Sequence, residues 1–156
     1  MRALPTLLIA CIAGLSLLAP APAPAAEPVT SVADLDLSRY AGQWYEIAHL
    51  PVSFQRQCAG DITATYALRA DGRIGVRNAC RTHEGKPAVA EGVADYWVIA
   101  LDPHYQWAMV GDPDRDYLWI LSREPSMDGE LFARLKAGAE AMGYDLAPLV
   151  VAAPLR

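Results

Sequence analysis

Short runs of alternating apolar and polar residues fill the chain between residues 42 and 122. Such runs are typical of β-strands whose two faces differ in environment. Asp-Gly and Asp-Pro sequences separate several of them and favour tight turns. Regular short strands joined by turns predict a single all-β domain, a sandwich or a barrel. The runs predict strands at residues 42–51, 62–68, 73–80, 87–94, 96–101, 107–110 and 117–122.

The hydrophobic period changes at both ends of this region. Residues 34–40 have the spacing of a helical turn. Apolar residues recur at helical spacing over residues 127–142, with Ser126 as the expected N-cap and Gly143 as the expected stop. We therefore expect one amphipathic C-terminal α-helix packed outside the sheet, followed by a short strand at residues 149–152.

The N-terminus has the layout of a secretory signal peptide. A basic start at Arg2 precedes an apolar run and an Ala-x-Ala site near Ala25 and Ala26. The apolar run is shorter than the roughly 20 residues of a transmembrane helix. We expect residues 1–26 to be a signal peptide and the protein to be exported to the periplasm.

Two further boundaries follow from this assignment. Residues 27–33 read as a linker, and residues 34–156 as the folded domain. Cys11 leaves an alternative open, because Leu8-Ile9-Ala10-Cys11 resembles the lipobox of bacterial lipoproteins. In that case the protein is an outer-membrane lipoprotein lipidated on Cys11.

The composition disfavours several function classes. The net charge is -5 and no run of basic residues occurs, which disfavours nucleic acid as a partner. No Gly-x-Ser-x-Gly turn, phosphate loop or His-Glu-x-x-His pattern is present, so we expect no enzyme and no cofactor. The histidines lack metal-ligand spacing, so we expect no metal site and place them on the surface or the barrel rim. These are His49, His83 and His104.

The cysteines indicate a disulfide. If Cys11 leaves with the signal peptide, Cys58 and Cys80 remain as an even pair in an oxidising compartment. Simple pairing across the Asp71-Gly72 turn leaves them a few residues out of register. A β-bulge is therefore needed to join them.

Three segments carry a resemblance to a known family. The first is Gly42-x-Trp44 after a helical turn, the second begins at Asp95-Tyr96, and the third ends at Arg123 ahead of the helix. Together and in this order they resemble the lipocalin family, and within it the bacterial branch related to apolipoprotein D. The resemblance covers the chain from about Asp34 to its end.

The resemblance implies an antiparallel up-and-down β-barrel with one helix outside. It implies that Trp44 closes the floor of the barrel and that Arg123 packs over its ring. Such a cation–π contact is worth roughly 1–2 kcal/mol when shielded from water. The implied ligands are fatty acids or lysophospholipids, with a role in membrane maintenance or stress in the cell envelope.

Strand alternation predicts which side chains face the interior. Trp44 points inward, so Glu46 and Ala48 are expected on the same face, and Glu46 is a candidate buried acid with a raised pKa. The alternative is that the aromatic residues fill a solid core. The candidate ligand-binding residues are Glu46, Tyr66, Tyr96, Trp97, Tyr117 and Trp119.

The chain departs from the family pattern between the strand at residues 88–94 and the motif at residues 95–102. We expect residues 87–101 to form one long bent strand with a hinge at Gly92, in a barrel shortened by two strands. A barrel shortened in this way has an open seam between two strands, which exposes unpaired backbone groups. It leaves open a homodimer that covers the gap, a protein-interaction module, a non-binding degenerate lipocalin and an association with the membrane.

Overall fold

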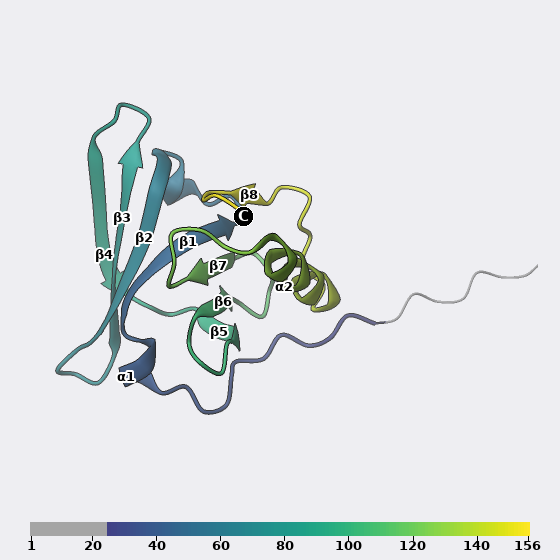
Figure 1. Ribbon diagram of the computed structural model, residues 1–156. Helices are drawn as coiled ribbons and strands as arrows, with labels where there is room; N and C mark the ends of the chain where they lie inside the picture. The colour runs from purple at the N-terminus through teal and green to yellow at the C-terminus, as the bar shows by residue number, and fades with distance from the viewer. Residues whose placement is uncertain (1–24) are drawn as a thin grey trace, which may run out of the picture.

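One antiparallel sheet with a helix against it makes up the part of the chain that the structure describes, residues 25–156 (Figure 1). The structure is a computed structural model. Nearly all of the predicted signal peptide, Cys11 included, lies outside the described residues. No helix within residues 25–156 is long and apolar enough to cross a membrane.

The strands follow the chain as an up-and-down meander. The elements are α1 (Leu37–Tyr40), β1 (Gly42–His49), the short 3₁₀ helix η1 (Ser53–Gln55), β2 (Cys58–Leu68), β3 (Ile74–Thr82), β4 (Pro87–Val93), β5 (Trp97–Leu101), β6 (Trp107–Gly111), β7 (Leu118–Ser122), α2 (Gly129–Ala141) and β8 (Val150–Val151). In space the strand order is β4-β3-β2-β1-β7-β6-β5, and β8 pairs with β1. The predicted all-β fold with one C-terminal helix is confirmed.

The predicted disulfide between Cys58 and Cys80 is present, with the two Cα atoms 5.6 Å apart. The strand register alone would not join them, because Cys58 lies opposite Thr82. Two register shifts, on either side of Gly60, bring Cys58 within reach of Cys80. Asp61 has a φ of 55° in this irregular stretch. The predicted need for a bulge is therefore confirmed.

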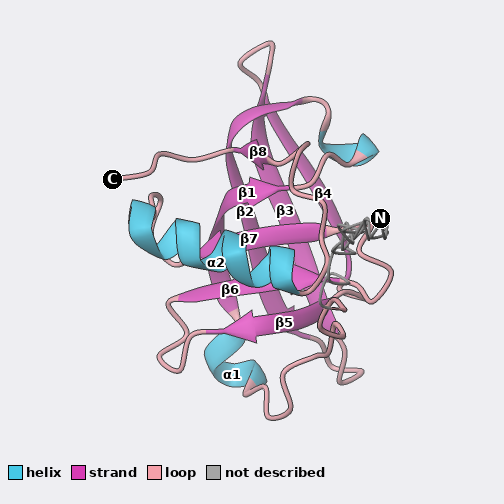
Figure 2. Ribbon diagram, turned by 90° about the vertical axis from the view of Figure 1, so that its right-hand side faces the viewer, coloured by secondary structure: helices cyan, strands magenta, loops and turns pink. Residues whose placement is uncertain are grey.

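Helix α2 lies across β6, β7 and β1 on the outside of the sheet (Figure 2). Phe132, Leu135 and Ala139 pack from the helix onto the outward side chains of the strands. The helix begins later than predicted, because the carboxylate of Asp128, rather than Ser126, caps it by accepting a hydrogen bond from Leu131 N. The expected stop is confirmed, since Gly143 follows the helix with a φ of 88°.

A second apolar cluster lies on the opposite, concave face of the sheet. It includes Trp44, Val98, Val110 and Trp119. Strict alternation of inward and outward side chains fails along β1. The register of β1 against β7 shifts between Glu46 and Ala48, and Ala48 belongs to the helix-side cluster instead of the interior. The expectation that Ala48 faces inward is therefore wrong.

The sheet does not close. Strands β4 and β5 are its two edges, and the antiparallel pairings along the sheet make them run in the same direction. Two strands that run in the same direction are expected here if one strand of the complete barrel, with the turns on either side of it, is missing between β4 and β5. The expectation of one long bent strand hinged at Gly92 is wrong, because β4 and β5 are separate strands and Gly92 pairs with Val76 inside the ladder. The break falls at residues 94–96, and we call this opening between β4 and β5 the seam.

Candidate ligand-binding cavity

The concave face of the sheet is closed at one end by a buried tryptophan. Trp44 is fully buried at the start of β1, and its indole Nε1 donates a hydrogen bond of 2.8 Å to the Tyr40 carbonyl oxygen. The Arg123 guanidinium lies 3.8 Å from the centre of the Trp44 ring. This is the floor contact that the resemblance implied.

Arg123 also ties the surrounding backbone together. Its guanidinium donates hydrogen bonds to the carbonyl oxygens of residues 39, 40, 41, 43 and 105. Gly42 lies directly below it with a φ of 97°, and a Cβ at this position would stand 3.4 Å from Arg123 Nη1. In the Gly42-x-Trp44 motif, Gly42 therefore supplies a left-handed backbone conformation and space for the Arg123 guanidinium, and Trp44 supplies the floor of the trough.

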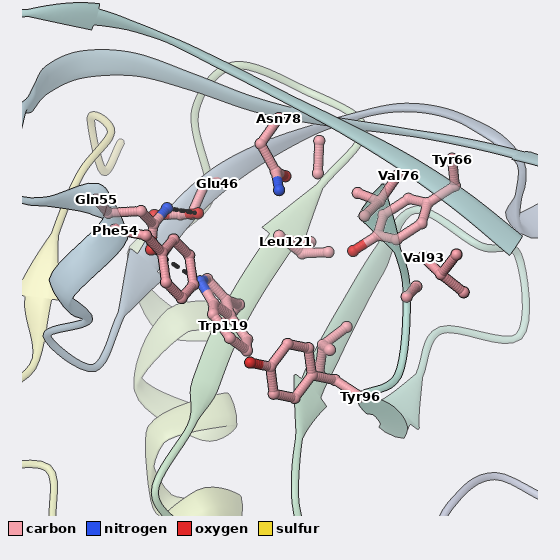
Figure 3. A pocket seen from close by; sticks show the side chains of 13 residues that line it. Glu46, Phe54, Gln55, Tyr66, Val76, Asn78, Val93, Tyr96, Trp119 and Leu121 are labelled. Atoms are coloured by element: carbon pink, nitrogen blue, oxygen red, sulfur yellow. Dashed lines mark hydrogen bonds between the residues drawn. The ribbon is translucent and has the colours of Figure 1, made fainter. Parts of the chain in front are cut away.

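Above this floor lies a hollow of about 70 Å³ (Figure 3). Its wall is formed by side chains from β1, η1, β2, β3, β6 and β7, together with Val93, Ala94 and Tyr96 beside the seam. It is lined by Glu46, Phe54, Gln55, Ala64, Tyr66, Val76, Asn78, Val93, Ala94, Tyr96, Val110, Trp119 and Leu121.

Two neighbouring hollows share side chains with the first. One of about 80 Å³ extends toward α1 and shares Tyr66 and Tyr96 with it. Another of about 60 Å³ extends toward the disulfide and shares Phe54 and Asn78 with it. We call the three together the trough. It follows the length of the concave face, from the floor to Cys58.

The structure brings four of the predicted ligand-binding residues into the first hollow: Glu46, Tyr66, Tyr96 and Trp119. Tyr117 does not line the trough but stacks on Trp119, with ring centres 5.9 Å apart and nearly parallel planes. Trp97 is 39% exposed and lines none of the three hollows. Trp97 therefore does not face the trough, because its neighbour Val98 takes the inward position on β5.

Sequence reasoning missed several residues of the wall. Phe54 and Gln55 lie in η1, between the strands predicted at residues 42–51 and 62–68, and no periodic pattern marked them. Val76 and Asn78 lie on β3, and the period of two along that strand would have placed them on one face. The alternation along β3 was therefore an unused signal.

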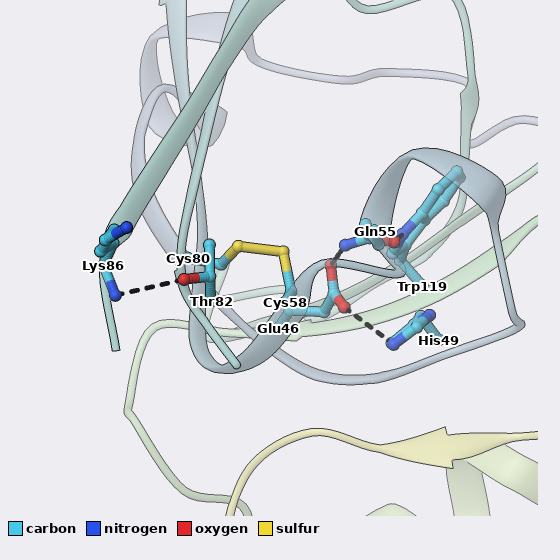
Figure 4. The surroundings of a disulfide bond; sticks show 8 residues. All are labelled: Glu46, His49, Gln55, Cys58, Cys80, Thr82, Lys86 and Trp119. Atoms are coloured by element: carbon cyan, nitrogen blue, oxygen red, sulfur yellow. Dashed lines mark hydrogen bonds and ion pairs between the residues drawn. A yellow bond between two sulfur atoms is a disulfide. The ribbon is translucent and has the colours of Figure 1, made fainter. Parts of the chain in front are cut away.

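A chain of polar groups runs along one side of the first hollow (Figure 4). Trp119 Nε1 donates to Gln55 Oε1 at 3.1 Å, and Gln55 Nε2 donates to Glu46 Oε2 at 2.7 Å. The other carboxyl oxygen of Glu46, Oε1, lies 3.6 Å from His49 Nε2. His49 Nδ1 lies 2.9 Å from the Leu50 carbonyl oxygen.

Burial changes the protonation of this group. Glu46 is only 5% exposed, and burial raises its pKa to about 8, although the hydrogen bond from Gln55 opposes the shift. Burial also lowers the pKa of His49. The prediction that Glu46 is buried is confirmed, and this burial is the cause of the raised pKa. His83 and His104 are exposed as expected, whereas His49 is buried.

The trough is otherwise free of formal charge. Among the residues that line its three hollows, Glu46 is the sole Asp, Glu, Lys, Arg or His. Within residues 25–156, no group of three or more His, Cys, Asp or Glu side chains is arranged to hold a metal ion. The site therefore offers an apolar, aromatic surface with one buried carboxyl group.

An up-and-down antiparallel sheet curved around an interior trough, with a tryptophan floor and a helix outside, defines a small barrel-type protein with one open seam. The chain belongs to the lipocalin family, in the bacterial branch related to apolipoprotein D. The model of the lipocalin-like domain matches residues 35–95 and residues 93–154. The two matched parts meet at the seam.

Named relatives support the same assignment. The chain is 37% identical to outer membrane lipoprotein Blc of Escherichia coli K12 over 172 positions, covering 96% of each protein. That alignment is longer than this chain of 156 residues, so some positions of the relative have no counterpart here. Apolipoprotein D of Rattus norvegicus is 29% identical over 145 positions, covering 74% of this chain and 75% of its own length.

A solved structure supports the fold. Per a 4 from cockroaches superposes with a TM-score of 0.65 at 20% identity, covering 83% of this chain and 94% of its own. At this level of identity the likeness concerns the fold alone.

Proposed function

We propose that the protein binds and carries a single-chain amphiphile, a fatty acid or a lysophospholipid, in the trough. The observation that carries the proposal is the size and lining of the trough. Each hollow is several times the roughly 10–15 Å³ that one water molecule needs, which argues against a solid core. Each is well below the roughly 300 Å³ typical of drug-sized pockets, which favours a narrow chain.

The lining suits an acyl chain. Aromatic and aliphatic side chains dominate it, and each methylene buried against them contributes about 0.8 kcal/mol. The seam gives a route of entry from the side, because Val93, Ala94 and Tyr96 belong both to the seam region and to the wall of the hollow. Tyr96 and Phe54 are 40% and 53% exposed at this wall.

The proposed place of action is the cell envelope. The signal-like N-terminus supports export, and the relative named outer membrane lipoprotein Blc supports an envelope location. Removal of residues 1–26 predicts a soluble periplasmic form, whereas lipidation on Cys11 predicts a membrane-anchored form. The mass of the protein extracted from its own host separates the two, since lipidation gives a mass well above that of the cleaved chain.

The test of ligand binding is a fluorescence titration. A fluorescent polyene fatty acid and its methyl ester are added separately to the purified protein, and energy transfer from the four tryptophans is followed. We expect saturable one-to-one binding of at least one probe, displaced by oleate or methyl oleate. Trp119→Phe is expected to reduce the transfer, whereas Trp97→Phe leaves more of it intact, because Trp119 lines the hollow. A folded protein that binds neither probe contradicts the proposal.

A second candidate function is a protein-interaction module at the seam, including a homodimer that covers it. It is favoured by the edge of β4, which pairs only with β3 among the described strands and exposes 52% of Val89. This candidate predicts association that depends on protein concentration without any lipid. Analytical ultracentrifugation of lipid-free protein distinguishes the two, because a carrier gains stability from its ligand by mass action instead.

A further inference from the structure

Two side chains that line the trough each carry a buried polar atom without a hydrogen-bond partner, the Tyr40 hydroxyl and the carboxyl group of Glu46, and only Glu46 can carry a charge in the range of neutral pH. Its Oε2 accepts a hydrogen bond from Gln55, but its buried Oε1 has no hydrogen-bond partner. A buried carboxyl oxygen without a partner is costly, by roughly 1–3 kcal/mol. Glu46 also lines the first hollow, so a ligand there lies beside a carboxyl group that has room for one more hydrogen bond.

The neighbours of Glu46 fix which atoms face it. The indole of Trp119 can only donate, so the carbonyl oxygen of Gln55 faces Trp119 and its amide NH₂ faces Glu46. His49 Nδ1 faces a carbonyl oxygen and therefore carries the hydrogen, which leaves Nε2 as an acceptor in the neutral ring. Glu46 Oε1 thus faces a second hydrogen-bond acceptor, His49 Nε2, at 3.6 Å, and a proton on the carboxyl group removes the repulsion between the two atoms.

The trough has no cation to neutralise an anionic head group. The guanidinium of Arg123, at the floor, is engaged with the Trp44 ring and with backbone carbonyl oxygens. Two neutral amides, those of Asn78 and Gln55, share the first hollow with Glu46 (Figure 3). Moving an unpaired carboxylate into such surroundings is strongly unfavourable.

We propose that Glu46, held by Gln55, is the head-group contact of the trough. Its carboxyl group accepts a hydrogen bond from an uncharged hydroxyl group of the amphiphile or, when protonated, donates one to an ester carbonyl oxygen, and it disfavours a free carboxylate beside it. The acyl chain then extends toward the floor, past Tyr66 and Val110. This inference rests on the proposed function, since it names the ligand class of the same site. Among the amphiphiles considered above, it disfavours a fatty acid in its ionised form.

The titratable groups around Glu46 do not change their charge in the pH range in which Glu46 is expected to ionise. His49 faces it from the same strand, and burial keeps that imidazole neutral near and above neutral pH by lowering its pKa. Tyr66 faces it from β2, and burial raises its pKa to about 12. Asp61 lines a separate hollow that also borders Glu46, and its carboxylate forms an ion pair with Arg81 at 2.7 Å. Leu121 and Trp119 from β7 carry no charge.

The test compares two ligands of equal chain length, decanol and decanoate, by isothermal titration calorimetry of the purified protein. At about pH 7 we expect decanol to bind at least about tenfold more tightly than decanoate. Decanoate is already ionised, so a pH effect on its affinity reports on the protein. From about pH 7 to about pH 9, decanoate affinity should fall by up to about tenfold as Glu46 ionises, whereas decanol affinity should change little.

A variant and a control complete the test. Glu46→Gln keeps the size and the donor but cannot ionise, so the fall in decanoate affinity between the two pH values should disappear. Glu84→Gln, at an exposed carboxylate, should behave as the unaltered protein does. Equal affinity for decanol and decanoate at both pH values would overturn the inference and leave the proposed function standing. Binding of neither ligand would overturn the proposed function itself.

Discussion

Replacement of Trp44 by Ala tests whether the floor of the sheet holds the fold together. Trp44 has no exposed surface. Its ring centre lies 5.2 Å from that of Tyr40 and 3.8 Å from the guanidinium carbon of Arg123. Ala removes this packing and leaves a cavity. Truncation of a buried Trp typically costs about 3–5 kcal/mol, which includes the cation–π contact of roughly 1–2 kcal/mol.

The local hydrogen bonds place the expected value inside that range. The Tyr40 carbonyl oxygen loses the indole donor but keeps a bond of 3.1 Å from Arg123 Nη2, so it is not left without a partner. Arg123 likewise keeps its other backbone acceptors. We therefore expect a loss of about 4 kcal/mol in the free energy of unfolding, with no added penalty for an orphaned polar group.

The assay is thermal unfolding followed by circular dichroism, with Trp97→Ala as the matched control. For a domain of this size, about 4 kcal/mol corresponds to a fall in Tm of roughly 10–20 °C. Trp97 is 39% exposed, so its truncation should cost less than about 1 kcal/mol. A Trp44→Ala protein that melts within a few degrees of the unaltered protein, or no more readily than Trp97→Ala, would refute the floor assignment.

Three further predictions follow from single features of the structure. Replacing Cys58 and Cys80 by Ser should reduce stability by about 3 kcal/mol, because the bond closes a loop with a separation of 22 residues; oxidised protein that reacts with two equivalents of a thiol reagent would contradict the bond. Gly42→Ala should cost about 1–2 kcal/mol in a denaturant titration, since its φ is 97° and the new Cβ approaches Arg123; an unchanged midpoint would contradict this. Burial raises the pKa of Glu46 to about 8 from an ordinary value of 4.5, so the folded protein holds a proton that the unfolded chain has released between these pH values. The free energy of unfolding should therefore fall as pH rises from about 4.5 to about 8, by on the order of 4 kcal/mol relative to Glu46→Gln; parallel stability curves for the two proteins would exclude a raised pKa.

The elements governed by local patterns were predictable from the sequence. The Asp71-Gly72 turn set the β2–β3 hairpin, with Gly72 at a φ of 80°. The pairing of the two cysteines required a bulge that the register then showed. The helical period located α2, although the cap moved from Ser126 to Asp128 because the helix begins after the carboxylate that accepts the Leu131 N–H.

The elements that depend on tertiary contacts were not predictable in the same way. Ala48 left the interior because β1 shifts register against a strand about 70 residues later in the chain. Gln55 entered the site because its amide joins Glu46 to Trp119, a link that no local pattern encodes. The position of the seam depends on where β4 stops pairing with β3, which is at Val93 and not at Gly92.

The most direct test of the account is to fill the trough and measure ligand binding again. Val76 lines the first hollow from β3, so Val76→Phe places a larger side chain in the space assigned to the acyl chain. Leu68→Phe, at a side chain that is 61% exposed, is the matched control. With the fluorescent methyl ester as the probe and melting curves to confirm folding, we expect Val76→Phe to lose binding by more than about tenfold and Leu68→Phe to retain it. Equal binding by both folded variants would mean that the ligand lies elsewhere and would contradict the account.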